Sequence, residues 1–193
     1  PQRKYHGIST QIIAQIKNVR VPFNIDIGVG DIIFPCAEER TINTQLLDFE
    51  APIVKTYSLE STVAEKFDAI LQRFELTGRM KDFYDIYYLS RTFNFDGERL
   101  QSAIFSTLQR RGTPYDRDSF KRVVSLADDE DMQKRWKYFL KTIKDDTIEF
   151  PFVIAEIWTF LEPVFDAIIN EVGWRKRWMV NLNWIKDERS YDL

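Results

Sequence analysis

The sequence predicts an α+β fold in which a small sheet is followed by a mostly α-helical part. Strand-like alternation of apolar and polar residues fills the first 30 positions, whereas helical spacing begins at Ser58 and continues to the end of the chain. The composition, 44% hydrophobic and 15% aromatic in 193 residues, is sufficient for a packed core. These observations predict two domains with a boundary near residue 58, at 1–57 and 58–193.

The first two strands are expected within residues 8–17 and 20–29. In each stretch every second residue is apolar or small, which is typical of a half-buried strand. The short link through Asn18 predicts a hairpin. Pro22 lacks a backbone N–H, so it predicts either an edge strand or pairing that begins after it.

An irregular stretch is expected at 31–50, with room for a short helix, and a third strand at 52–57. Ser58 can cap the first helix, which Gly78 would follow, and Pro163 is expected to kink or divide a later one. The expected helices lie at about 58–76, 80–92, 97–110, 117–127, 129–144, 151–171 and 174–185.

The composition excludes several classes of protein. No apolar run approaches the roughly 20 residues that a membrane span needs, and the chain carries no signal-peptide pattern. Cys36 is the only cysteine and His6 the only histidine, which favours a reducing, cytoplasmic setting and excludes histidine-based triads. The net charge of −3 means that any RNA contact requires a local basic patch. The chain lacks an initiator Met, so we expect it to be truncated or processed.

Asp26 is the first candidate for chemistry. It lies on the polar face of the second expected strand, beside Asn24. A carboxylate held on a rigid strand can bind a metal ion because the strand fixes its direction. The alternative is an acid that is simply solvated on an open sheet face.

Two cations of the first expected helix are the second candidate. At 100° per residue Lys66 and Arg73 fall on the same flank of its apolar stripe, which predicts that both border a cleft. Paired cations suit phosphate binding. The alternative is that both stems lie along the edge of the core with their charges in solvent.

The helix expected at 80–92 is apolar except for one sector of about 100° that holds Lys81, Asp82 and Asp85. Buried carboxylates need partners, and Lys66, Arg73 and Arg79 are near in sequence. The sector is either a functional cluster or a structural ion-pair network, and the helical geometry leaves both open.

At these residues the sequence resembles the AbiEii/AbiGii family of nucleotidyltransferase toxins, from about Tyr5 to Leu89. The segment NIDIGVGDIIFP resembles the strand that carries a third acidic position of the family, which places Asp26 there. The family's recurring elements are matched by Glu60, Ala64-Glu65-Lys66, Arg73, Arg79 and Lys81-Asp82-x-x-Asp85.

The resemblance implies a polymerase-β-like nucleotidyltransferase sheet, of which this chain keeps the last strands, followed by a helical domain. It implies an enzyme that binds a nucleoside triphosphate with Mg2+ and transfers a nucleotide to an acceptor such as tRNA, as a toxin with a separate antitoxin. Lys66 would contact phosphate with support from Arg73 and Arg79, and Asp85 would be a site carboxylate. Lys81 and Asp82 would orient this cluster, and Asp26 would bind metal.

The family's first motif, a Gly-Ser followed by an Asp-x-Asp pair, does not occur in these residues. The Asp-x-Asp at 116–118 lies at an expected helix start, which favours capping. Metal-assisted transfer needs several acidic ligands. We therefore expect a C-terminal portion of a nucleotidyltransferase that is inactive by itself.

A non-catalytic helical module that binds RNA or a protein is the alternative. It is motivated by the missing motif and by a C-terminal segment in which cations alternate with Trp174, Trp178 and Trp184. These tryptophans either stack on bases or pack a terminal helix onto the core.

Overall fold

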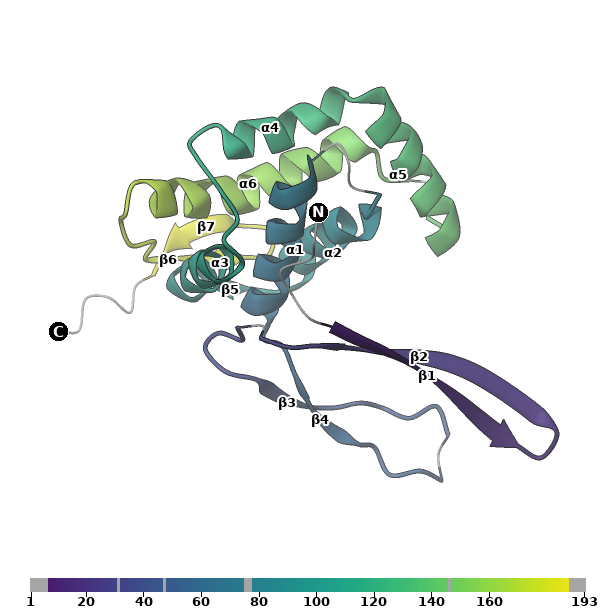
Figure 1. Ribbon diagram of the computed structural model, residues 1–193. Helices are drawn as coiled ribbons and strands as arrows, with labels where there is room; N and C mark the ends of the chain where they lie inside the picture. The colour runs from purple at the N-terminus through teal and green to yellow at the C-terminus, as the bar shows by residue number, and fades with distance from the viewer. Residues whose placement is uncertain (1–6, 31, 47, 75–77, 146, 188–193) are drawn as a thin grey trace. The chain divides into compact units, whose positions relative to one another are not determined.

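The computed structural model describes residues 7–30, 32–46, 48–74, 78–145 and 147–187, so His6 lies outside the described residues. The chain divides into two compact units, 1–32 and 33–193. Small antiparallel sheets and a run of helices that begins at Leu59 confirm the α+β class (Figure 1). The functional boundary near residue 58 stays a prediction.

The first unit contains a hairpin of β1 (Gly7–Ile16) and β2 (Val19–Gly28), as predicted. The ladder runs without a break from the Gly7–Gly28 pair to the Ile16–Val19 pair. Pairing therefore starts before Pro22, and the prediction that it begins afterwards is wrong; in this two-stranded sheet each strand is an edge. Half burial was also wrong, because every residue of both strands is exposed.

The second unit begins with β3 (Glu38–Thr41) paired with β4 (Ile53–Thr56), and β4 confirms the third predicted strand. The sequence EERT of β3 has no apolar alternation, so that strand was missed. The chain before β3 is fastened to the first helix. The backbone N–H of Phe34 donates to Ser61 Oγ at 2.7 Å, and Ser58 Oγ donates to the Phe34 carbonyl at 2.5 Å.

Six predicted helices are confirmed with small shifts of their ends. The fourth is shorter than expected because the chain tightens into a 3-10 turn at 126–128, and Pro163 does not divide the sixth. The six helices are α1 (Leu59–Arg73), α2 (Met80–Thr92), α3 (Gly97–Arg111), α4 (Ser119–Ser125), α5 (Glu130–Ile143) and α6 (Phe150–Ile169).

The prediction of a helix at 174–185 is wrong. The segment forms β6 (Lys176–Met179) and β7 (Asn183–Lys186). In an antiparallel sheet β6 lies in the middle, paired with β5 (Phe95–Asp96) on one side and with β7 on the other. Trp178 is buried, and its indole N–H donates to the Ser90 carbonyl at 2.7 Å. Burial of this side chain and pairing with β5 override the helical spacing.

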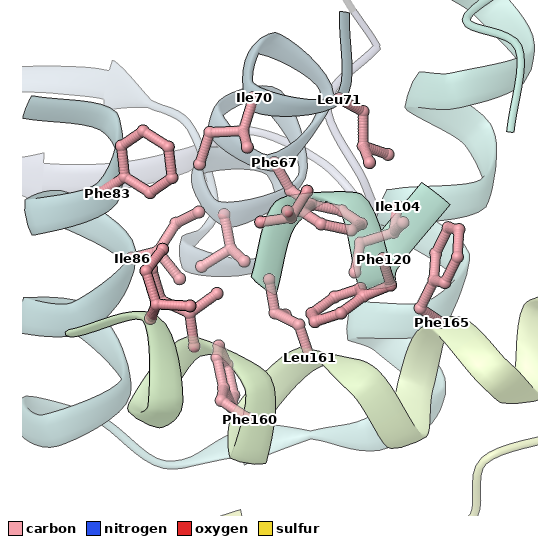
Figure 2. Packing of buried hydrophobic residues seen from close by; sticks show 14 of the residues in the cluster. Phe67, Ile70, Leu71, Phe83, Ile86, Ile104, Phe120, Phe160, Leu161 and Phe165 are labelled. Carbon is pink, nitrogen blue, oxygen red and sulfur yellow. The ribbon is translucent and has the colours of Figure 1, made fainter. Parts of the chain in front are cut away.

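The core of the second unit lies between the six helices α1 to α6. Figure 2 shows the part of it that α1, α2, α3, α4 and α6 contribute. Phe67 of α1 is fully buried, and its ring lies 5.4 Å from that of Phe120 and 5.6 Å from that of Phe165. This packing fixes α1, whose polar edge carries the predicted site residues. Among the described residues, no helix is both long and apolar enough to span a bilayer.

Candidate functional site

Lys66 joins the first two helices of the second unit. Its Nζ lies 3.2 Å from Asp82 Oδ1 and 2.8 Å from Asp85 Oδ2, so one ammonium on α1 meets two carboxylates on α2. Ser58 fixes the start of α1 because its hydroxyl accepts a hydrogen bond from the Ser61 N–H at 3.1 Å. The three site residues that the sequence placed near one another are therefore in contact.

Asp82 is the most buried member of this cluster, with a side chain 3% exposed. Its Oδ2 lies 3.0 Å from Arg79 Nε in an ion pair that lacks hydrogen-bond geometry, and this buried oxygen accepts no hydrogen bond from the described residues. Lys81 lies at the margin. Its side chain is 74% exposed and its Nζ is 4.0 Å from Asp85 Oδ2, which makes a weak surface pair.

A second charged network lies on the same side of α1. Arg111, the last residue of α3, contacts Glu65 through Nη2 and lies 3.3 Å from Asp68 Oδ2 through Nη1. Asp68 is fully buried, and it accepts hydrogen bonds from Thr113 Oγ1 and from Gln72 Nε2. Two carboxylates on one helix therefore fix the direction of this guanidinium.

Burial raises the pKa of Asp68 to about 6, against the opposing effect of the hydrogen bonds from Thr113 and Gln72. The neighbouring Arg111 also favours the ionised form. A carboxyl in these surroundings changes charge near neutral pH, so the charge next to Arg111 depends on pH.

The two networks border one hollow with a volume of about 310 Å³. Lys66 from α1, Arg79 from the start of α2 and Arg111 from the end of α3 bring three cations to its wall. Convergence of cations from separate helices makes a wall suited to an anionic ligand. The complete lining is Tyr57, Thr62, Glu65, Lys66, Ala69, Arg79, Asp82 and Arg111.

Four predicted residues are not among those that line the hollow. Lys81 and Asp85 reach it only through their contacts with the Lys66 cluster, and the other two are Arg73 and Asp26. Arg73 is exposed in the last turn of α1 and does not line the hollow. Asp26 is exposed on β2, where it pairs with Ser9, and belongs to the other compact unit. The roles expected of both residues stay predictions.

Within the described part of the chain, no group of three or more histidine, cysteine or acidic side chains could hold a metal ion. The carboxylates of the hollow are paired with cations instead, so these residues by themselves do not fit a Mg2+ centre. The Asp-x-Asp at 116–118 stabilises the start of α4: Asp116 Oδ1 accepts from the Asp118 N–H at 3.0 Å and from Ser119 Oγ at 2.9 Å. The N-cap residue itself is Asp118, whose side chain accepts no capping hydrogen bond, so the capping prediction is wrong for Asp118 and Asp116 instead closes the turn before the helix.

Arg111 and Asp68 were missed by the sequence reasoning. Arg111 lies 46 positions from Glu65, and no local spacing connects them. Asp68 did carry a signal, because a carboxylate flanked by Phe67, Ala69 and Ile70 on a buried helix requires a partner.

The tryptophans of the C-terminal segment pack inward, although on strands and not on the expected helix. Trp184 Nε1 donates to the Phe160 carbonyl at 2.9 Å, and the rings of Trp178 and Trp184 lie 5.6 Å apart. Their packing against the core accounts for their presence, which weakens the case for base stacking at this segment.

The class of protein follows from residues 1–171, which match a model of nucleotidyltransferase toxins. The chain belongs to that family, described as the nucleotidyl transferase AbiEii toxin of a type IV toxin–antitoxin system. No curated protein matches it. No solved structure matches it either.

Proposed function

We propose that residues 33–193 form the phosphate-binding, helical side of a nucleotidyltransferase toxin that transfers a nucleotide from an NTP to an acceptor such as tRNA. The observation that carries the proposal is the hollow to which three helices each bring a cation, Lys66, Arg79 and Arg111. Family membership supplies the reaction class. A cytoplasmic location and neutralisation by a cognate antitoxin are part of the same proposal.

Lys66 is the proposed phosphate contact. An ammonium has three N–H donors, and Asp82 and Asp85 are the two carboxylates that lie beside it. The third donor is available to a phosphate oxygen, while the two carboxylates hold the side chain in one position. Asp85 thus acts as a site carboxylate that positions Lys66, and Lys81 is its weaker partner at the surface.

Arg79 and Arg111 are the other proposed phosphate contacts. Arginine forks match phosphate oxygens, and a guanidinium that is already oriented loses less entropy on binding than a mobile one. Arg111 is oriented by Glu65 and Asp68. Arg79 is oriented by Asp82.

Mg2+ is part of the proposal through the family alone. The described residues do not form a metal centre, and Asp26 is one carboxylate where the chemistry needs several. We therefore propose that residues 1–193 bind nucleotide but do not catalyse transfer without further acidic ligands.

Nucleotide binding can be tested on the 193-residue chain by the shift of its melting temperature with each NTP. Lys66→Met keeps the aliphatic stem and removes the charge, so it should abolish the shift. Lys121→Met, at an exposed pair on α4, is the matched control and should retain the shift.

A second variant guards against a loss of folding. The double variant Lys66→Met/Asp82→Asn avoids leaving a buried carboxylate beside an apolar side chain, and it should fold and also fail to bind.

Transfer can be tested by incubating the full-length protein with tRNA and labelled NTPs. Incorporation should be lost in Lys66→Ala and in Asp85→Ala. Incorporation that persists in both variants would remove these residues from the mechanism. A full-length protein that binds no NTP would refute the proposal.

A further inference from the structure

Helix α5 presents a cationic face to solvent. Lys134, Lys137 and Lys141 fall within about 100° of the helix circumference. All three are exposed, and α5 carries four cations against two carboxylates although the chain as a whole has a net charge of −3. Figure 1 shows α5 at the periphery of the helical unit.

The carboxylates of α5 do not neutralise this face. Glu130 and Asp131 lie at the helix start, 3.7 and 3.4 Å from Lys134 Nζ, and all three side chains are at least 70% exposed. Such pairs are weak in water. Within the described part of the chain, neither Lys137 nor Lys141 forms an ion pair.

An aromatic ring lies in the middle of the lysines. Tyr138 is 74% exposed, on the side of α5 opposite the buried Met132, Trp136 and Leu140. It borders a groove of about 460 Å³ that continues between α5 and the start of α2. Gly78 and Met80 form the α2 side of that groove, directly next to Arg79 of the hollow.

We propose that this α5 face, with Lys134, Lys137, Tyr138 and Lys141, binds a strand of RNA and guides it toward the hollow. The cations rise along about 10 Å of helix, which matches the closely spaced charges of a phosphate chain. The exposed ring can stack on a base, and a basic groove with an aromatic platform is the common design for single strands. That this RNA is the acceptor rests on the proposed function.

The charge alone also suits an acidic protein segment or an anionic bilayer. Tyr138 favours RNA, because neither an acidic peptide nor lipid headgroups would gain base stacking from that ring. The groove favours RNA as well, since it runs from Lys134 and Tyr138 to Gly78 and Met80, the residues on either side of Arg79.

The test uses the 193-residue chain and a labelled single-stranded RNA of about 12 nucleotides, within the usual range of site sizes. Binding is followed by fluorescence anisotropy at several salt concentrations. The variant Lys134→Ala/Lys137→Ala/Lys141→Ala should weaken binding at least tenfold and make the slope of log K against log salt less negative by about 2. Tyr138→Ala should weaken binding about tenfold with little change in that slope.

Matched controls remove the same charges or the same ring elsewhere. Lys55→Ala/Lys121→Ala/Lys186→Ala takes three exposed lysines from other elements, and Tyr88→Ala removes an exposed ring from α2. Both should bind RNA like the unmodified chain. Equal losses in the controls, or no RNA binding at low salt, would overturn the proposal.

Two further binding measurements test whether the α5 face binds an acidic peptide or an anionic bilayer instead of RNA. Tighter binding to a poly-glutamate peptide or to phosphatidylserine vesicles than to RNA, unaffected by Tyr138→Ala, would also overturn the assignment to RNA. The NTP-dependent melting shift separates this inference from the proposed function. The α5 variant should keep that shift, and a chain that binds RNA through α5 without binding NTP would refute only the proposed function.

Discussion

The hairpin and the helical bundle have equally regular sequences and opposite surroundings. One face of the hairpin is formed by cross-strand pairs such as Ile8–Ile27 and Ile12–Phe23, yet these side chains are 38 to 65% exposed. In α1 the apolar stripe that includes Val63 and Phe67 is fully buried. In these two regions periodicity indicates the element and its apolar face correctly, whereas burial depends on a second surface that periodicity does not describe.

Phe67→Ala should give the largest effect. The ring is fully buried between Phe120 and Phe165, so its removal should lower the free energy of unfolding by about 3–5 kcal/mol. Phe23→Ala removes the same group from β2, where the side chain is 45% exposed, and should cost less than about 1 kcal/mol. Urea denaturation of both variants measures the difference. Equal losses would show that the hairpin face is buried in solution.

Asp68 gives the next largest effect, and it depends on pH. Its pKa of about 6 in the folded chain lies above its ordinary value of 3.8, so between these values the folded chain binds a proton that the unfolded chain has released. Stability should therefore fall as pH rises from about 4 to above 6, by up to about 3 kcal/mol.

The variant Asp68→Asn isolates this contribution. The difference between its unfolding free energy and that of the parent should change across this pH range, because other carboxyls titrate alike in both proteins. A constant difference would mean that Asp68 has the same pKa in the folded and the unfolded chain.

Ser58→Ala should have a smaller effect, about 1–2 kcal/mol, on the same unfolding measurement. The hydroxyl caps α1 and also donates to the Phe34 carbonyl, so its loss leaves the Ser61 N–H without its acceptor and the carbonyl with only the longer bond from Ser61 Oγ, at 3.2 Å. Ser9→Ala on β1, at an exposed position, should change stability by less than about 0.5 kcal/mol. A neutral Ser58→Ala would show that water replaces both bonds.

The sequence predicted the helices well because their ends carry local signals. Ser58 caps α1 through its own hydroxyl, and Asp96 and Gly112 mark the two ends of α3. The prediction failed at β6 and β7. There the strand conformation depends on the pairing of β6 with β5 and on the hydrogen bond from Trp178 to the Ser90 carbonyl. Local spacing contains no information about a partner 88 residues away.

The candidate site likewise contains contacts that local sequence signals predict and contacts that they do not. The contacts of Lys66 with Asp82 and Asp85 were predictable because each helix showed its polar sector in sequence. The contacts of Arg111 were not predictable, since its position depends on how α3 packs against α1. Contacts of this kind follow from the tertiary packing of α1 against α3, which helical spacing does not encode.

The first turn of α2 is a shared wall. Arg79 and Asp82 face the hollow, while Gly78 and Met80 face the groove beside α5. A movement of that turn would change the hollow and the groove together. Binding of an RNA strand against α5 would then change the affinity for a small anion beside Lys66, and the reverse. Lys66 connects α2 to α1 through its contacts with Asp82 and Asp85, so these ion pairs restrain the movement of that wall.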